Sequence, residues 1–215
     1  MIKAIIFDMD GVLIDTPEHT WEIHNLLLAD YGKNVSDREI PRYLGRSLRD
    51  QINLFKKNFN ITIDEDGYMV EFKLQEKKFI EKVKRHEFLI NLFKHLKERF
   101  LLAVATSSPT ARALNILAQL GIKEYFDVII GAEKVKEHKP DPGLFLKAAE
   151  QLKVNPEECI VVEDALNGIE AAKKGHMKVV ALVSKFLTAQ DLKDADIVIN
   201  NLGELKASLE KISLG

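Results

Sequence analysis

The sequence predicts an α/β fold, a doubly wound (Rossmann-like) parallel sheet with an inserted helical cap domain, and three observations lead to that prediction. Short apolar segments of strand length recur along the chain. Segments with helical start and stop signals separate them, and alternating strands and helices are typical of a parallel sheet covered by helices. One stretch of roughly seventy residues breaks this alternation, because it contains helical patterns and no convincing buried strand.

Six short apolar segments are the expected strands of the sheet. Most of them lack polar residues at alternate positions, so we expect both of their faces to be covered, as in a parallel sheet. The expected strands span residues 4–7, 101–105, 128–130, 160–162, 179–183 and 197–199.

Proline and glycine punctuation places helices between these strands. In Ser108-Pro109 a serine N-cap would precede proline at the first helical position, and we expect this helix to run to Gly121. Asp141-Pro142 repeats the signal. A third helix is expected over 165–174, with Gly175 closing it.

The break in the alternation predicts two domains. Residues 1–15 and 88–215 would form the core, and residues 16–87 would form an insertion after the first strand. Ligands of α/β proteins bind at the carboxyl ends of the strands, so a small helical unit there is a natural lid. Its expected helices span residues 21–31, 48–59 and 68–83.

The composition is that of an ordinary folded protein and disfavours several classes. Of the 215 residues 46% are hydrophobic and 30% charged, which fits one large domain or one domain with an insertion. The net charge of −2 gives no reason to expect nucleic-acid binding. No apolar stretch approaches the roughly 20 residues of a membrane span. The single cysteine, Cys159, allows no internal disulfide. With no secretory leader before the first strand, we expect a cytoplasmic protein, and we expect a monomer.

Two aspartates directly follow the first expected strand. Asp8 and Asp10 precede Gly11, and carboxylates this close repel each other, so one pKa should rise unless a cation lies between them. The pattern predicts a bound metal ion, a catalytic acid with a nucleophile, or both. A solvated acidic turn is the simpler interpretation. A calcium loop of the EF-hand kind is disfavoured because Val12 occupies a ligand position.

Hydroxyl side chains follow the second expected strand. Thr106, Ser107 and Ser108 lie at the expected N-terminus of a helix, where backbone N–H groups and hydroxyls together can cradle an anion. Capping of the next helix by Ser108 is the simpler interpretation. Capping does not account for Thr106 and Ser107.

A lysine and an acidic pair complete the set. Lys139 precedes Pro140 on a stiffened loop, so its charge can be aimed, although an exposed surface lysine is the common alternative. Glu163 and Asp164 follow the expected strand 160–162 and resemble ligands of a hard cation. The simpler alternative is that Asp164 caps the next helix.

All four groups fall at strand–helix junctions that should share one edge of the sheet. Carboxylates of the first and fourth groups would hold a small divalent cation such as magnesium. Hydroxyls of the second group and the ammonium of the third would surround an anion beside it. This combination is typical of a phosphoryl-transfer site.

With these motifs in order, the chain resembles the haloacid dehalogenase superfamily, and most of all its branch of β-phosphoglucomutase and phosphoglycolate phosphatase-like enzymes. The resemblance spans essentially the whole chain and implies that the insertion is a four-helix cap. The matching segments are residues 8–16, 105–108, 139–142 and 162–168.

The resemblance also implies catalytic roles. Asp8 would attack phosphorus and form an aspartyl phosphate, and Asp10 would serve as general acid and base. Thr106, Ser107 and Lys139 would bind the phosphoryl oxygens.

The implied cofactor is Mg²⁺. Its ligands would be Asp8, the main-chain carbonyl of Asp10, and Asp164, with Glu163 as a ligand or beside one. Candidate residues for the substrate and the cap are Thr16, His19, Arg46, Arg49 and Lys77.

The leading hypothesis is a magnesium-dependent phosphatase acting on a small phosphorylated metabolite, such as a sugar phosphate. The alternative is a β-phosphoglucomutase-type mutase, which must exclude water until a sugar hydroxyl arrives. Both use Asp8 and Asp10, so the core motifs do not separate them. A response-regulator-like module is less favoured because such domains lack an inserted cap. A phosphate-binding pseudoenzyme is less favoured because every catalytic position is present.

Overall fold

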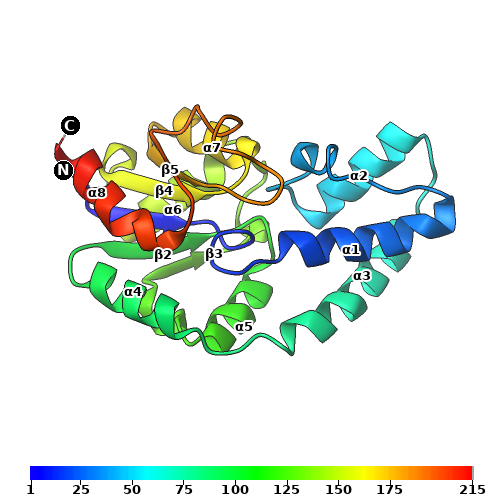
Figure 1. The fold of residues 1–215 in the computed structure, drawn as a ribbon, viewed down its shortest axis with the longest axis horizontal. Helices are drawn as coiled ribbons and strands as arrows, with labels where there is room; N and C mark the ends of the chain where they lie inside the picture. The colour runs from blue at the N-terminus through cyan, green and yellow to red at the C-terminus, as the bar shows by residue number, and fades with distance from the viewer. Residues whose placement is uncertain (215) are drawn as a thin grey trace.

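The computed structural model describes residues 1–214 and contains a six-stranded sheet in which every paired strand is parallel to its neighbour, so the predicted α/β fold is confirmed (Figure 1). The strand order is β3-β2-β1-β4-β5-β6. Four strands have the predicted bounds, β4 is one residue longer at each end, and β5 lies one residue earlier. The strands are β1 Ala4–Phe7, β2 Leu101–Ala105, β3 Val128–Ile130, β4 Cys159–Glu163, β5 Lys178–Leu182 and β6 Ile197–Ile199.

Helices connect the consecutive strands from β1 to β5, whereas the segment from β5 to β6 contains only turns and bends. The α-helices are α1 Pro17–Leu28, α2 Leu48–Phe59, α3 Glu65–Ile80, α4 Glu87–Lys97, α5 Thr110–Leu120, α6 Gly143–Leu152, α7 Leu166–Lys174 and α8 Leu205–Leu214. The short 3₁₀ helices are η1 Ala29–Tyr31, η2 Ile40–Arg42, η3 Lys123–Tyr125, η4 Ala132–Lys134, η5 Pro156–Glu158 and η6 Leu202–Glu204.

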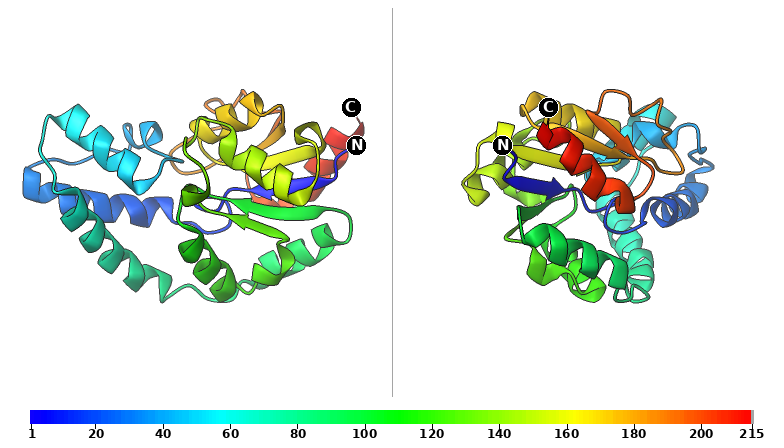
Figure 2. Two further views of the ribbon diagram at one scale, coloured as in Figure 1. Left: turned by 180° about the vertical axis from the view of Figure 1, so that it is seen from behind. Right: turned by 60° about the vertical axis from the view of Figure 1, so that its left-hand side comes forward.

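The sheet is the middle layer of three, because successive side chains of a strand point to opposite faces. Ile6 packs into the cluster that includes Phe145 of α6 and residues of α7. Phe7 packs into the cluster that includes Phe93 of α4 and residues of α5 and α8. Figures 1 and 2 show these two helical layers on either side of the strands. All four residues of β1 are fully buried, so the strand is held rigidly at the centre.

Residues 16–87 contain α1, α2 and α3, which lie at the far end of the molecule from the N-terminus and α8 (Figures 1 and 2). The structure has no strand in this stretch, as predicted. The resemblance implied four helices, but three α-helices and the short η1 and η2 occupy it instead. Proline at the second position of η2 is compatible with a helix start, and the chain leaves the helical conformation after a single turn. The division into domains at 15/16 and 87/88 stays a prediction.

Several helix starts differ from the predictions, and the largest shift is in α1, which begins at Pro17 rather than 21. Helix α3 begins at Glu65 rather than 68, because acidic residues in its first turn complement the positive end of the helix dipole. Helix α5 has Pro109 at its N-cap position, and the Ser108 hydroxyl does not cap it but donates to Asp10. Likewise Pro142 is the N-cap residue of α6.

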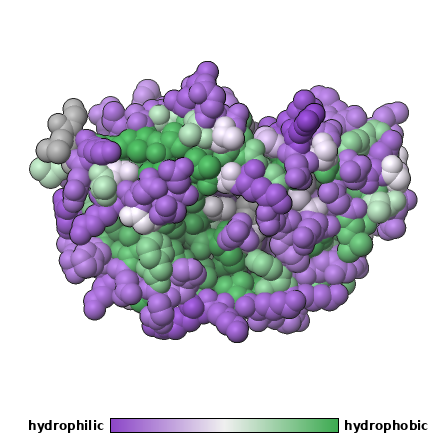
Figure 3. All heavy atoms as spheres, viewed as in Figure 1, coloured by the Kyte–Doolittle hydropathy of each residue, from purple (hydrophilic) through white to green (hydrophobic). Residues whose placement is uncertain are grey.

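The face of the molecule seen in Figure 3 carries both apolar and hydrophilic side chains. In the view of Figure 3, apolar side chains gather mainly over the part that contains the sheet, and the helical part at the right is largely hydrophilic. Val70 and Leu74 are large exposed apolar side chains four residues apart, on one face of α3. No helix within residues 1–214 combines the length and the apolar character needed to cross a membrane.

A buried histidine holds α1, α2 and α3 together. His24 of α1 is fully buried, and its Nε2 lies 2.8 Å from Oε1 of Gln51 in α2. Its Nδ1 lies 3.0 Å from the hydroxyl of Tyr68 in α3. The amide oxygen of Gln51 accepts, so Nε2 carries the proton and Nδ1 accepts from the tyrosine. Burial lowers the pKa of His24 to about 4, against a smaller opposite effect of the Gln51 hydrogen bond.

We predict that protonation of His24 destabilises the fold in acid. In the unfolded chain the imidazole has its ordinary pKa of about 6.5. The stabilisation that neutral His24 gives to the folded state is therefore complete above about pH 6.5 and is lost as the pH falls towards 4. The loss is at most about 3 kcal/mol, from 1.4 kcal/mol per unit of pKa difference. Urea unfolding of wild type and His24→Gln between pH 7 and pH 4 measures it. The wild-type advantage should shrink as the pH falls, and a constant difference would contradict the assignment.

Candidate active site

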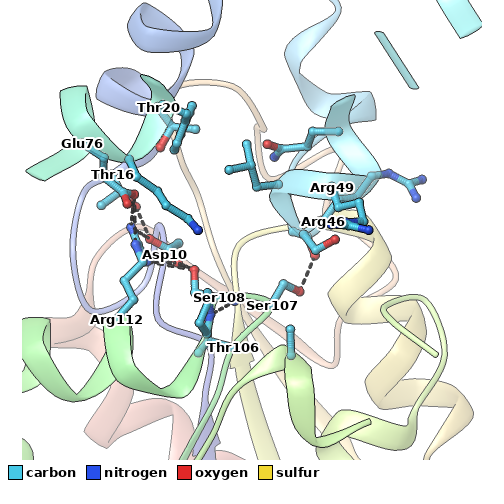
Figure 4. Close-up of a pocket in the computed structure, with 18 of the residues that line it drawn as sticks. Asp10, Thr16, Thr20, Arg46, Arg49, Glu76, Thr106, Ser107, Ser108 and Arg112 are labelled. Carbon is cyan, nitrogen blue, oxygen red and sulfur yellow. Dashed lines mark hydrogen bonds and ion pairs between the residues drawn. The ribbon is translucent and has the colours of Figure 1, made fainter. Parts of the chain in front are cut away.

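The four sequence motifs meet at the carboxyl edge of the sheet. Phe7 pairs with both Val104 and Val162, so the residues that follow β1, β2 and β4 leave the sheet at the same level. The strand order also reverses its direction between β1 and β4, which is where doubly wound proteins bind ligands. A cavity of about 890 Å³ opens there, between this edge and the helices α1–α3. Figure 4 shows side chains that line it.

Lys139 is the centre of the buried part of the site. Its ammonium lies 2.6 Å from Oδ1 of Asp8 and 2.7 Å from Oε1 of Glu163, and its side chain is fully buried. The ammonium also lies 4.7 Å from the ring centroid of Phe145, a cation–π contact. The predicted exposed-lysine alternative is therefore wrong. A buried ammonium needs partners of opposite charge, and strands β1 and β4 provide them.

Glu163 points inward rather than to the cavity. Its Oε2 accepts hydrogen bonds of 2.7 Å from the backbone N–H groups of Asp164 and Ala165, and its Oε1 accepts from Lys139. Gly168 makes room for this carboxylate, because a Cβ at that position would lie 1.8 Å from Oε1. Asp164 does not cap α7, whose N-cap residue is Ala165.

The electrostatics of the acidic group call for more positive charge than Lys139 supplies. Burial raises the pKa of Asp8 to about 7, with Lys139 acting against this and Glu163 adding to it. Burial, followed by the charges of Glu163 and Asp8, also raises the pKa of Asp164 well above its usual range. Three buried carboxylates face one ammonium, which leaves two excess negative charges when all are ionised.

This excess charge fits a divalent cation, which would relieve the repulsion in the group. Asp8 and Asp164 both line the cavity, whereas Glu163 is engaged with Lys139. Gly11 allows Asp164 to approach, because a Cβ there would lie 1.9 Å from Oδ2 of Asp164. Within residues 1–214 no three His, Cys, Asp or Glu side chains are arranged to hold a metal ion. The ligands expected from the sequence include only two carboxylates, those of Asp8 and Asp164, and their third ligand is a main-chain carbonyl rather than a side chain.

Asp10 lies in a separate network that the sequence did not reveal. Arg112 of α5 donates two hydrogen bonds of 2.8 Å to the two carboxylate oxygens of Asp10. The hydroxyls of Thr16 and Ser108 donate to it over 2.7 and 2.9 Å. Burial opposes ionisation of Asp10, but the charge of Arg112 and these hydrogen bonds hold its pKa below the ordinary value. Arg112 also contacts Glu76 of α3 at 2.9 Å.

The other two hydroxyls of the motif after β2 make different contacts from that of Ser108. Thr106 is buried, and its Oγ1 accepts from the backbone N–H of Ser108. Ser107 donates a 2.9 Å hydrogen bond to the carbonyl of Gly45, in the loop before α2. The inserted segment therefore lies directly against the predicted phosphate-binding residues. Close to this contact, neither amide atom of the buried Asn167 has a hydrogen-bond partner among residues 1–214.

The structure brings four of the five predicted cap-side residues to the cavity. Thr16, Arg46, Arg49 and Lys77 line it, and Figure 4 shows Arg46 and Arg49 across the cavity from Asp10. His19 does not line the cavity.

His19 stacks on Phe79 with the ring centroids 4.5 Å apart, and it lies near Glu22. Helical register explains the difference, since Thr16 and Thr20 face the cavity and position 19 lies on another face of α1.

Sequence reasoning missed Arg112 and Glu76. Arg112 lies four residues after Ser108, so the two reach the same side of the first turn of α5, where their side chains are 2.9 Å apart. That spacing was a usable signal for Arg112. Nothing local points to Glu76, because only the packing of α3 beside α5 joins them.

Comparison with known proteins agrees with this geometry. The family described as haloacid dehalogenase-like hydrolase matches residues 5–182 of the chain. A phosphorylated carbohydrates phosphatase of Thermotoga maritima is 34% identical over 174 residues, which cover 80% of this chain and 81% of that protein. A fructose-1-phosphate phosphatase of Escherichia coli is 30% identical, with 82% of this chain and 94% of that protein covered.

Among solved structures, the crystal structure of a β-phosphoglucomutase from Clostridium difficile superposes with a TM-score of 0.86. It is 26% identical, and the match covers 98% of this chain and 96% of that chain. The likeness therefore includes the inserted helices as well as the sheet.

We predict that Gly168→Ala destabilises the fold, whereas Gly67→Ala does not. The new Cβ at 168 would overlap a fully buried carboxylate that three hydrogen bonds hold in place, at a cost of about 1–3 kcal/mol. At 67 the overlap is with the exposed end of Asp64, which can rotate, and the alanine adds at most about 1 kcal/mol of helix propensity. Urea unfolding compares them, and equal stability of the two variants would contradict the tight seat of Glu163.

Proposed function

The chain belongs to the haloacid dehalogenase-like hydrolase family, and from that premise we propose that it is a magnesium-dependent phosphatase for a small phosphorylated carbohydrate or similar metabolite. As a member whose relatives hydrolyse phosphate esters, it is a phosphoric monoester hydrolase. The observation that carries the proposal is the 2.6 Å contact of Lys139 with Asp8 at a cavity that Asp10 and Thr106 also line.

In the first step an oxygen of Asp8 bonds to phosphorus while the bond from phosphorus to the ester oxygen breaks. Lys139 holds the Asp8 carboxylate in place and offers its positive charge to the phosphoryl oxygens. Thr106 and Ser107 contribute hydroxyl donors at the end of β2. The leaving oxygen takes a proton from Asp10, because an alkoxide is otherwise a poor leaving group.

In the second step water hydrolyses the aspartyl phosphate. Asp10 takes a proton from the water while the water oxygen bonds to phosphorus and the bond from phosphorus to Asp8 breaks. The products are inorganic phosphate and the regenerated Asp8 carboxylate. Asp10 therefore carries a proton at the end of the second step. Because its pKa is low in the substrate-free site, the first turnover requires Asp10 to take up a proton as the substrate binds.

Magnesium completes the proposed site. Asp8, Asp164 and the main-chain carbonyl of Asp10 would hold it, with Glu163 anchoring Lys139 beside them. When bound, the ion neutralises charge on the phosphoryl group. Its support is the excess negative charge of the buried carboxylates and the raised pKa values of Asp8 and Asp164.

The cationic side chains that line the cavity fit a small anionic or polar substrate. Arg46 and Arg49 lie across the cavity from Asp10, and Lys77 lines the cavity from α3, so these three are the proposed contacts for the part of the substrate away from the phosphoryl group. Every proposed catalytic residue comes from one chain, so we propose that a monomer suffices. Nucleic acid and membranes have no part in the proposal.

We predict hydrolysis of phosphorylated carbohydrates that depends on both aspartates. With Mg²⁺ present, purified wild-type protein should release inorganic phosphate from members of a panel that includes fructose 1-phosphate. Asp8→Asn should abolish turnover, and Asp10→Asn should slow it by about two to four orders of magnitude. Asp30→Asn, an exposed aspartate in η1, is the matched control and should keep the wild-type rate. Activity that survives in Asp8→Asn would contradict the covalent route.

One further assay separates a phosphatase from a mutase, the function of a structural relative. Incubation with β-glucose 1-phosphate and a catalytic amount of glucose 1,6-bisphosphate yields free phosphate from a phosphatase and glucose 6-phosphate from a mutase. We expect free phosphate, and glucose 6-phosphate as the main product would replace the proposal by the mutase alternative.

We predict that Mg²⁺ stabilises the protein in the absence of substrate. At ten times its Kd the ion adds about 1.4 kcal/mol, which for a chain of this size raises Tm by about 3–6 °C. Asp164→Asn should remove most of this shift while leaving the magnesium-free Tm unchanged or higher, because it deletes one charge from a repulsive group. NaCl at matched ionic strength is the control. An equal magnesium shift in wild type and variant would contradict the proposed ligand set.

A further inference from the structure

One guanidinium joins Asp10 to the inserted helical segment. Arg112, in the first turn of α5, donates from one terminal nitrogen to Oδ2 of Asp10 and from the other to Oδ1, both over 2.8 Å. Its Nε donates to Oε1 of Glu76 in α3 over 2.9 Å. Figure 4 shows Arg112 between these two carboxylates. Three segments far apart in the sequence therefore meet at one side chain.

The contacts of Arg112 with Glu76 and Asp10 hold the guanidinium in one orientation. The side chains of Arg112 and Glu76 are each only 14% exposed, so water competes weakly for their hydrogen bonds. A guanidinium presents its N–H groups in a planar fork that fits both oxygens of a carboxylate at once. The plane of the Asp10 carboxylate is therefore fixed by the orientation of the Arg112 guanidinium.

The hydrogen bonds around Asp10 show how a reacting group could enter. Thr16 and Arg112 donate to Oδ1, and Ser108 and Arg112 donate to Oδ2, so the four acceptor positions of the carboxylate are filled. A hydroxyl can rotate away, whereas the two N–H groups of a guanidinium cannot leave independently. A reacting oxygen would thus displace Thr16 or Ser108 and find the carboxylate still oriented by Arg112.

Glu76 makes this orientation depend on α3. Without Glu76 the guanidinium would keep its pair with Asp10 but lose the partner that fixes its other edge. Movement of α3 away from α5 would break the same contact.

From these contacts, and resting on the proposed function for the role of Asp10, we propose that Arg112 is a positioning residue. Held by Glu76, it orients Asp10 for proton transfer, so that seating of α3 against α5 and alignment of the acid occur together.

The test uses two substrates that differ in their need for an acid. The p-nitrophenolate group leaves without a proton, whereas the sugar alkoxide of fructose 1-phosphate requires one. The quantity to compare is kcat/KM, which ends at departure of the leaving group and is insensitive to later hydrolysis of the aspartyl phosphate. If fructose 1-phosphate is a poor substrate, the best alkyl phosphate of the panel replaces it.

We predict that Arg112→Ala lowers kcat/KM for the alkyl phosphate by about tenfold or more but for p-nitrophenyl phosphate by less than about threefold, since acid catalysis contributes at least that much. Arg112→Lys should recover only part of the loss, because one ammonium cannot grip both oxygens. Glu76→Gln should show the same selective loss at smaller size. Adding Glu76→Gln to Arg112→Ala should cause no further loss if Glu76 acts through Arg112. Arg85→Ala, which removes an exposed ion pair, is the control.

Three outcomes would overturn the proposal: an equal fall for both esters, no fall for either, or faster cleavage of the alkyl phosphate. Glu76→Gln keeps the size of the side chain, so it tests the idea even if Arg112→Ala fails to fold. A folded Glu76→Gln with the wild-type ratio of the two esters would refute the coupling. A wild-type protein that hydrolyses neither ester would instead refute the proposed function.

Discussion

The site depends on a buried ammonium that two carboxylates hold. Burial alone would lower the pKa of Lys139, but the charges of Asp8 and Glu163 outweigh it and keep that pKa above the usual range. The lysine is therefore charged inside the protein, where an unpaired charge would be very costly. Because its partners extend from the adjacent strands β1 and β4, the pairing fixes the loop before α6 against the middle of the sheet.

The two aspartates after β1 occupy opposite environments although only Met9 separates them. Asp8 faces the buried lysine together with two other acids, and burial raises its pKa to about 7. Asp10 faces Arg112, Thr16 and Ser108, which hold its pKa low against burial. Successive turns of the chain after β1 send the two side chains to different partners. Their proposed roles as nucleophile and as acid–base rest on position, since Lys139 orients one carboxylate and Arg112 the other. The pKa directions in the substrate-free site are opposite to those roles, so binding of the metal ion and the substrate must reverse them.

Much of the site followed from local signals. An apolar segment that is buried on both faces shows where a strand ends, and the polar residues just beyond Phe7, Ala105 and Val162 must then lie at one edge of a parallel sheet. The helix starts did not follow from local signals alone, because a serine at position 108 can cap α5 or donate to Asp10, and only the folded chain decides between the two. His19 was misplaced for a similar reason, since one residue of register on α1 separates the cavity from Phe79.

By itself the sequence determined the parallel sheet, its helical insertion and the meeting of Asp8, Lys139 and Asp164, because hydrophobic periodicity and strand ends are local properties. Tertiary structure alone decided that Glu163 anchors Lys139 and that Arg112 and Glu76 surround Asp10. Such contacts depend on how α3 packs beside α5 and on which buried charge reaches which partner. Which buried charges pair is decided by the cost of desolvating each charge and by its attraction to a partner. Those partners lie on segments that are far apart in the sequence.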